Sequence, residues 1–141
     1  MAGGDAEAFA RCRDLFACFA PRAFHLGPCG SGARMKLVVN LVLGLNRAAL
    51  AEGLAFAAAC GVDPAVALEV LKAGVSYSRV MDTKGPKMLA ADFTPEARLS
   101  QHLKGARLPL SGLHRELLER LEAAGLGAAD NCAIIEAFRQ R

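Results

Sequence analysis

Residues 31–60 form a long run without proline in which most side chains are apolar. Ser31 follows a glycine-rich turn and Gly61 supplies a stop, so the run predicts one uninterrupted helix. At ~1.5 Å per residue such a helix is roughly 40 Å long. Apolar side chains occur on nearly every side of it. We therefore expect other helices to surround it and the fold to be organised around it.

The residues before this run predict a short α/β lead-in. Residues 5–19 place apolar side chains at helical spacing, and Asp5 stands where it can cap that helix. Pro21 stops the helix, and residues 23–26 form a short apolar run that predicts a lone strand. The chain offers this strand no partner, which indicates that part of a sheet is missing.

The residues after the run predict further helices. Asp63 and Pro64 begin one that reaches Leu71 and is closed by Gly74. The others are expected over residues 77–84 (broken at Gly85-Pro86), 94–104, 111–124 and 128–139. In the helix over 111–124, the side chains expected to point inward are Leu113, Leu117, Leu118 and Leu121. The predicted fold class is mainly all-α, with one long central helix and a short α/β lead-in.

The composition argues against several classes of function. The chain has 141 residues, 53% of them hydrophobic, which suits one domain with its own core. The net charge is only +3, basic residues are scattered, and Trp is absent, so we expect no nucleic-acid partner. Polar residues such as Asn40 and Arg47 interrupt the long run. Its uncharged stretches fall short of the ~18–20 residues that a membrane span needs, so we expect no membrane partner.

The cysteines and the first residues favour a cytoplasmic protein. There are five cysteines with no CxxC spacing, which is typical of free thiols in a reducing compartment rather than of disulfides or zinc. The three histidines lie too far apart in the sequence to suggest a metal site, so we expect none. Asp5 and Glu7 stand where a signal peptide would be basic and then apolar.

Lys36 and Asn40 stand four residues apart near the start of the long helix, directly behind Gly30-Ser31-Gly32. A pair at this spacing shares a helix face, so both side chains can reach one small ligand. A lysine among apolar side chains is costly to bury charged, which favours the neutral amine and a role as general acid/base. Taken without any resemblance, each residue alone favours a structural reading: a lysine extending to solvent and a buried amide with satisfied hydrogen bonds.

Gly44 and Arg47 continue the same arc of the helix surface. Glycine has no side chain, so we expect open space beside the polar positions at Gly44. The arc as a whole therefore predicts a polar stripe along one side of an apolar helix.

Gly30, Ser31, Gly32, Lys36 and Asn40 resemble the signature G-x-G-x-x-x-K-x-x-x-N of the β-hydroxyacid dehydrogenases. That family includes 3-hydroxyisobutyrate dehydrogenase and tartronate semialdehyde reductase. Further landmarks of the family have similar counterparts in the same order, namely residues 48–55, Asp92-Phe93, His102-Leu103-Lys104 and residues 130–133. The resemblance covers most of the chain.

The resemblance implies an enzyme with two domains. An N-terminal Rossmann domain would hold NAD or NADP, and a helical domain like that at the C-terminus of 6-phosphogluconate dehydrogenase would pair with a second subunit, giving a homodimer. Lys36 would be the catalytic acid/base on the hydroxyl of a small 3-hydroxy acid, whose hydride passes to the nicotinamide. Asn40 would bind the substrate, the turn Gly30-Ser31-Gly32 would let it approach the backbone, and Lys104 would lie beside the cofactor.

The sequence departs from the family in two places. It contains no GxGxxG motif behind a strand; residues 1–29 resemble only the end of a Rossmann domain, and residues 30–141 the helical substrate and dimerisation domain. After Lys104 it has Gly105 where the family usually has Asp, and the segment that follows is shorter than the family's. We therefore expect an NAD(P)-dependent oxidoreductase reduced to its C-terminal domain and inactive alone. The alternatives are a non-catalytic helical dimerisation module and a truncated gene product.

Overall fold

The computed structural model describes residues 1–104 and 109–139 of the chain. These residues group into two compact units, Met1–Asn40 and Leu41–Arg141, with the division inside the long helix. The predicted boundary between residues 29 and 30 separates a remnant of a Rossmann domain from the helical domain. It stays a prediction. Each unit is described by itself below.

The first unit begins with two short helices in place of the single one expected over residues 5–19. These are α1 (Ala6–Arg11) and α2 (Arg13–Ala17), separated at Cys12, where φ is −90° and ψ is 6°. The predicted cap is confirmed: the Oδ1 atom of Asp5 accepts a hydrogen bond from the backbone N–H of Ala8 at 2.7 Å. The apolar spacing thus predicted helix correctly but gave no signal for the break at Cys12.

The short apolar run over residues 23–26 does find a partner inside the chain, contrary to the prediction. Ala2 pairs with His25 in a parallel bridge. The N–H of Ala2 donates to the carbonyl of Phe24, and that of Leu26 donates to the carbonyl of Ala2, both at 2.9 Å. The pairing stops at this isolated bridge. The described residues therefore form helices and no strand, and the expected α/β lead-in is not seen as a sheet.

The long helix is confirmed as α3 (Ser31–Ala59), and it ends before Gly61, whose φ is +76°. Its cover is uneven, however. All its buried residues lie between Gly44 and Leu54. In its first half, Leu37 is 62% exposed, Val38 49% and Val42 50%. Helices therefore cover the stretch Gly44–Leu54, and the expectation that they also surround the first residues of α3 stays a prediction.

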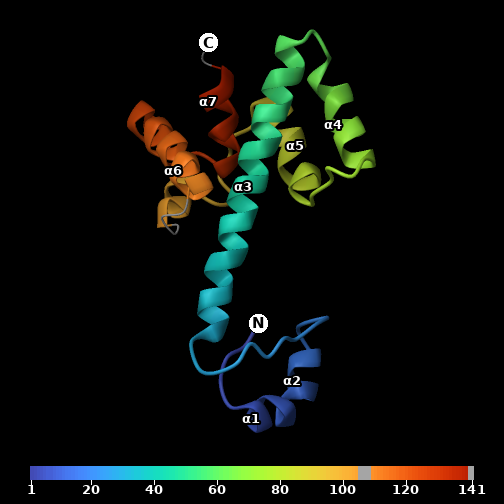
Figure 1. Cartoon of the computed structure of the whole chain (residues 1–141), viewed down its shortest axis with the longest axis vertical. Coiled ribbons are helices and arrows are strands. Elements are labelled where there is room, and N and C mark those ends of the chain that lie inside the picture. The colour runs from blue at the N-terminus through green and yellow to red at the C-terminus, as the bar shows by residue number, and fades with distance from the viewer. Residues whose placement is uncertain (105–108, 140–141) are drawn as a thin grey trace. The chain divides into compact units, whose positions relative to one another are not determined.

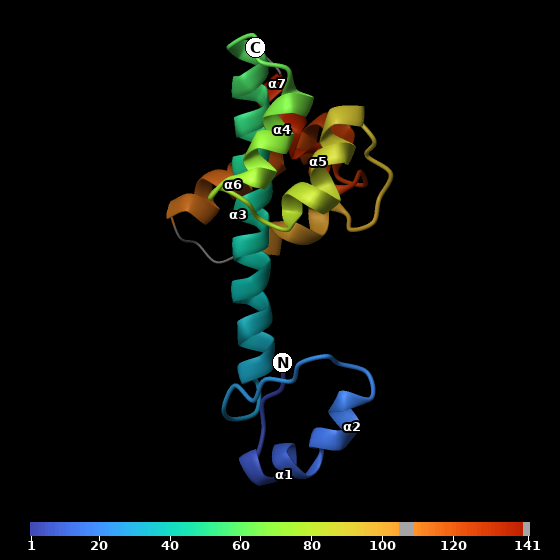
Figure 2. The same ribbon diagram turned by 90° about the vertical axis from the view of Figure 1, so that its right-hand side faces the viewer.

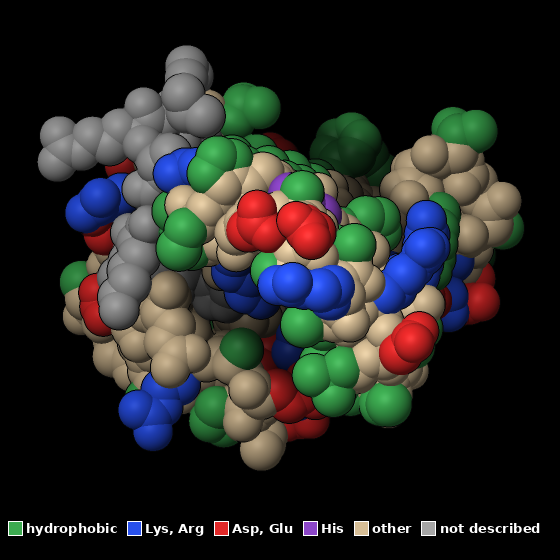
Figure 3. All heavy atoms as spheres, turned by 90° about the horizontal axis from the view of Figure 1, so that it is seen from below, with side chains coloured by type: hydrophobic (Ala, Val, Ile, Leu, Met, Phe, Trp, Pro, Cys, Tyr) green, Lys and Arg blue, Asp and Glu red, His purple; other side chains and the backbone are tan. Residues whose placement is uncertain are grey.

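Length and composition alone would allow α3 to cross a membrane, a test that the core helix of a soluble protein also passes. Its buried stretch is part of a helical core and includes the guanidinium of Arg47. The predicted absence of a membrane partner stays a prediction. So does that of a nucleic-acid partner; on the face shown in Figure 3, basic side chains lie among acidic and hydrophobic ones.

The second unit packs its helices on the C-terminal half of α3. In the view of Figure 1, α4 (Pro64–Ala73) and α5 (Val80–Ala90) lie on one side of α3, and α6 (Pro109–Leu121) and α7 (Glu136–Arg139) on the other. Figure 2 shows α4 running along α3. The side chains of the core that are no more than 3% exposed include Leu50, Leu54, Leu68, Val80, Met88, Leu99, Leu118, Leu121, Cys132, Ile134 and Ile135. The predicted start of α4 is confirmed, since Asp63 Oδ1 accepts from the N–H of Ala65 at 2.8 Å.

The predicted break at Gly85-Pro86 is wrong, because α5 continues through both residues to Ala90. A Cβ added to Gly85 would lie 2.7 Å from Leu68 Cδ1, so glycine lets α5 approach α4 closely. Met88, one turn later, is fully buried. This packing outweighs the backbone hydrogen bond that Pro86 cannot donate.

The segment expected to be helical over residues 94–104 is helical only in its second half. The 3-10 turn η1 (Leu99–Lys104) begins at Leu99, while Glu96 and Ala97 donate their N–H groups to the carboxylate of Asp130. Long-range bonds therefore replace the first helical turn.

The last two predicted helices are also shorter than expected. After α6 comes the π-turn η2 (Glu122–Leu126), and residues 128–139 divide into the 3-10 turn η3 (Asn131–Ile135) and α7. Leu118 and Leu121 are buried as predicted, whereas Leu113 is 59% exposed. Gly125, at φ +88°, ends the helical geometry before residue 128.

The imidazole of His114 from α6 packs directly against the backbone of Gly44. This contact leads to a first testable prediction. A Cβ on Gly44 would lie 2.7 Å from His114 Cε1, whereas one on Gly53 of the same helix would meet nothing within 4 Å. We expect Gly53→Ala to raise the free energy of unfolding by about 0.5–1 kcal/mol through helix propensity. Gly44→Ala has the same gain but overpacks the core, so it should lower that free energy by about 1–2 kcal/mol. Urea unfolding of both variants tests this; equal effects would contradict the packing described.

Candidate functional site

The turn ahead of α3 has a fixed backbone geometry. Gly30 has a φ of +87°, a conformation that favours glycine. The N–H of Ser31 donates to the carbonyl of Pro28 at 3.0 Å, and that of Arg34 to the carbonyl of Gly30 at 3.1 Å. The side chain of Arg34 donates to Ser31 Oγ at 3.0 Å. The turn is therefore ordered by its own hydrogen bonds.

Gly32 and Gly3 are required by the way the N-terminal segment packs on this turn. A Cβ on Gly32 would lie 3.2 Å from the carbonyl oxygen of Met1, and one on Gly3 would lie 2.6 Å from that of Pro28. The glycine at position 32 thus has a structural reason within the first unit. The predicted roles of Gly30, Ser31 and Gly32 in substrate binding stay predictions.

Lys36 and Asn40 lie one turn apart in the first half of α3, where the four-residue spacing places them on one face. The Lys36 side chain is exposed and Asn40 is partly buried. The apolar neighbours of Lys36 are themselves exposed, with Leu37 at 62% and Met35 at 37%. The described residues therefore do not dry this amine.

Lys104, the predicted cofactor contact, is the last residue of η1. Its side chain and the shortening expected after it fall outside what the structure describes. Its role beside a cofactor stays a prediction.

The space predicted beside Gly44 is filled by His114, which is only 9% exposed. Arg47, one turn along α3, is 3% exposed. Burial lowers the pKa of Arg47 to about 10, although the charges of Asp130 and Cys132 act in the opposite direction. This part of the arc is thus a polar portion of the core.

His114 gives the protein a predicted dependence on pH. Burial and then the charge of Arg47 hold the pKa of His114 below its usual value. A histidine with a lowered folded pKa binds its proton more readily in the unfolded chain, so stability is full above about pH 6.5 and falls as the pH drops below that. We expect the urea midpoint to decrease between about pH 7.5 and about pH 5.5. His114→Gln should flatten this decrease, and an unchanged slope would contradict the assignment.

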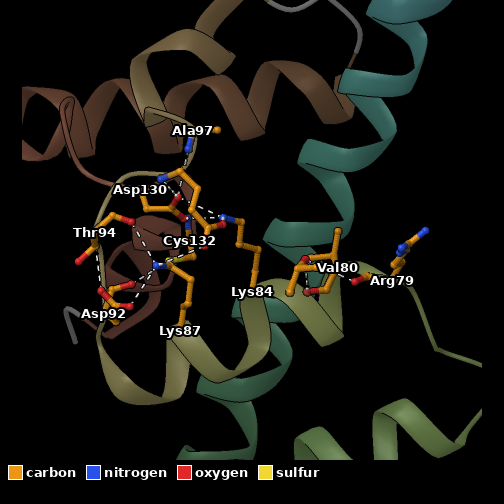
Figure 4. Close-up of polar contacts among 11 residues, drawn as sticks. Arg79, Val80, Lys84, Lys87, Asp92, Thr94, Ala97, Asp130 and Cys132 are labelled. Atoms are coloured by element: carbon orange, nitrogen blue, oxygen red, sulfur yellow. Dashed lines mark hydrogen bonds and ion pairs between the residues drawn. The ribbon is translucent and has the colours of Figure 1, made fainter. Parts of the chain in front are cut away.

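A cluster of charged side chains lies in the helical unit, around Lys84 of α5 and Asp130 ahead of η3 (Figure 4). Asp130 is completely buried and Lys84 is 8% exposed. Lys84 Nζ lies 3.1 Å from both carboxylate oxygens of Asp130 and 2.7 Å from Glu96 Oε2. Beside it, Lys87 pairs with Asp92 at 3.1 Å nearer the surface.

The buried carboxylate is ionised. Burial raises the pKa of Asp130, but the N–H groups of Cys132 and Glu96, followed by the side chains of Cys132 and Lys84, outweigh it and hold that pKa below its usual range. Burial, and then its hydrogen bond with Asp130, raises the pKa of the Cys132 thiol to about 12, so this thiol is not a nucleophile.

The sequence interpretation missed Lys84 as a buried charge. A signal was present, because Val80, Lys84 and Met88 stand at four-residue spacing and all three are buried. The predicted helix ended at residue 84, so the prediction did not place Met88 on the same helix face. Its partner Asp130 was noted only as part of a resemblance.

The described residues form an all-helical domain organised around the long helix α3, and a known protein family shares this domain. The family described as "NAD-binding of NADP-dependent 3-hydroxyisobutyrate dehydrogenase" matches residues 30–138. The chain belongs to this family, among the β-hydroxyacid dehydrogenases, and the predicted resemblance is confirmed. The match begins at Gly30 and includes Lys36, Asn40 and Lys104.

Known proteins are similar along almost the whole chain. Glyoxylate/succinic semialdehyde reductase 1 of Arabidopsis thaliana is 30% identical over 99% of this chain and 52% of its own length. 2-Hydroxy-3-oxopropionate reductase of Escherichia coli (strain K12) is 28% identical over 98% of this chain and 51% of its own length. A solved structure of 3-hydroxyisobutyrate dehydrogenase from Salmonella typhimurium shares the fold, with a TM-score of 0.86, 24% identity, and coverage of 96% of this chain and 52% of that one. The chain thus spans about half the length of these relatives.

Proposed function

We propose that this chain supplies the substrate-binding and dimer-forming half of an NAD(P)-dependent oxidoreductase that acts on small 3-hydroxy acids. The observation that carries the proposal is the family match from Gly30 onward, which includes the amine and the amide on one face of α3. The names of the relatives, which are reductases and dehydrogenases of small oxo and hydroxy acids, support the substrate class. In this proposal residues 1–29 derive from the end of a Rossmann domain, and the protein is cytoplasmic.

The chemistry assigned to the patch is one proton transfer and one hydride transfer. Lys36 would accept the proton of the substrate hydroxyl, and NAD or NADP, when bound, would supply the acceptor for the hydride from the same carbon. In the reverse direction Lys36 returns the proton to the oxygen. Asn40 donates its amide N–H to the substrate and accepts from a hydroxyl, which orients the reacting carbon.

Among the residues of this chain, we assign only Lys104 to the dinucleotide. Lys104 at the end of η1 would pair with a phosphate of NAD or NADP, which supplies the hydride acceptor when bound. The sequence has no GxGxxG turn between a strand and a helix, and the described residues form no strand. The larger part of the cofactor must therefore be held by residues outside this chain's described helices. Those residues and the cofactor would cover the exposed first half of α3 and exclude water from Lys36.

Titration calorimetry with NAD and NADP tests this proposal. The chain alone should give no measurable binding heat. The same chain joined to the N-terminal half of the Escherichia coli relative should bind one of the two with a Kd of about 1 μM to 1 mM. A joined protein that is folded by circular dichroism yet binds neither nucleotide would overturn the proposal.

A second candidate is a non-catalytic helical dimerisation module, and the uncovered apolar side chains of α3 favour it. Leu37, Val38 and Val42 stand on the unburied half of the helix. Light scattering should then give the mass of a homodimer, and a folded, strictly monomeric chain would contradict dimerisation. Lys36→Ala separates the two candidates, since the dimerisation of a non-catalytic module should not change in this variant. A truncated gene product with no selected activity is the third alternative. An intact Rossmann-encoding frame directly upstream would favour a split or frameshifted enzyme over a module.

A further inference from the structure

The function proposed above makes no use of the buried ion pair between Lys84 and Asp130. We propose that Asp130, held by Lys84, is a positioning residue for the cofactor side of the site. It fixes the backbone of residues 96–100 and thereby sets where the turn Leu99–Lys104 begins. This inference rests on the proposed function, which places Lys104 beside NAD(P).

The carboxylate of Asp130 is the centre of the anchor (Figure 4). Its Oδ2 atom accepts the backbone N–H of Glu96 at 3.0 Å and that of Ala97 at 3.3 Å. Its Oδ1 atom accepts the N–H of Cys132 at 3.0 Å. One buried side chain therefore binds the segment before η1 to the start of η3, two parts of the chain more than 30 residues apart.

Backbone hydrogen bonds continue this attachment into the turn itself. The N–H of Leu99 donates to the carbonyl of Ala129 at 3.0 Å, and that of Ser100 donates to the carbonyl of Gly127 at 3.3 Å. In the other direction, the N–H of Asn131 donates to the carbonyl of Ala97 at 3.1 Å. The Leu99 side chain is fully buried. The first residue of η1 is thus held on both its backbone and its side chain, and Lys104 follows one and a half turns later.

Lys84 places a positive charge directly beside this buried carboxylate. Its ammonium lies 3.1 Å from both oxygens of Asp130 and is itself 8% exposed. A buried carboxylate without its cation is costly and either takes up a proton or opens to water. In both cases it would hold the N–H groups of Glu96 and Ala97 less strongly, since hydrogen bonds to a charged acceptor are about twice as strong as neutral ones.

Amide hydrogen exchange in the full chain tests the anchor directly. Asp130→Asn and Lys84→Met should speed exchange at Glu96, Ala97, Leu99 and Ser100 by at least about tenfold, while the amides of α4 stay within about twofold. Lys84→Arg keeps the charge and the donors and should restore slow exchange. Lys87→Met is the matched control, because Lys87 lies on the same helix but contacts Asp92 and the carbonyl of Thr94. Unchanged exchange at the four amides in Asp130→Asn would overturn the inference.

Steady-state kinetics of the chain joined to a Rossmann half separates positioning from a general structural role. Lys84→Met should raise the KM for NADP at least about fivefold and leave the KM for the hydroxy acid within about twofold, with Lys84→Arg close to the unmodified chain. An equal change in both KM values would overturn the inference. If the unmodified joined protein shows no turnover, the proposed function fails, while hydrogen exchange still decides whether the anchor exists.

Discussion

Replacing Lys36 by alanine is expected to lower the kcat of the chain, when joined to a Rossmann half, by about 10²–10⁴-fold. Removing the amine leaves the substrate hydroxyl without a group to take its proton as the hydride departs. Asn40 remains on the adjacent turn of α3, so the KM for the hydroxy acid should change much less than kcat. Steady-state rates at saturating NADP give both values.

The control for this variant is Lys72→Ala. Lys72 lies in α4 and pairs with Glu69 and Asp82 at 3.5 Å and 3.6 Å. Its loss should leave kcat within about twofold, because pairs at a surface contribute little. A Lys36→Ala protein that is folded and retains kcat within about threefold would exclude Lys36 as the acid/base.

Asp130→Ala is expected to lower the free energy of unfolding by about 3–5 kcal/mol. The substitution leaves the ammonium of Lys84 with Glu96 as its remaining partner, and it removes the acceptor from three backbone N–H groups. Each of these groups would lose more than a hydrogen bond, since it stays away from water. Urea or thermal unfolding followed by circular dichroism measures the change.

Asp92→Ala is the matched comparison for that experiment. Asp92 also pairs with a lysine of α5, but its side chain is 48% exposed, so its loss should lower the free energy of unfolding far less than that of Asp130. A cost for Asp130→Ala as small as that for Asp92→Ala would show that the buried pair does not organise the helical unit.

Local signals predicted much of the fold. The bounds of α3 follow from a run without proline between two glycines, and the caps at Asp5 and Asp63 lie where the sequence placed them. The mistakes are at positions where distant parts of the chain decide the outcome. Helix α5 continues through Pro86 because Gly85 fits against Leu68, a contact that no window of the sequence contains. The segment before η1 is extended because its N–H groups bind Asp130.

The residues of the candidate site also divide into those that local spacing predicts and those that depend on distant contacts. Lys36 and Asn40 could be found from spacing alone, since both belong to one helix and their relation is fixed by its pitch. The pair Lys84–Asp130 joins residues 46 apart in the sequence, and its burial depends on the packing of α5 against η3. The drying of Lys36 was expected from its apolar neighbours. Those neighbours are exposed in the described chain, so the helix by itself does not shield the amine from water.

The most direct measurement is the reduction of NAD or NADP by this chain joined to the N-terminal half of a relative, with small 3-hydroxy acids as substrates. We predict turnover with at least one acid, accompanied by loss of activity in Lys36→Ala. A joined protein that binds the nucleotide but oxidises none of the acids would contradict the assignment of this helical domain to hydroxy-acid oxidation.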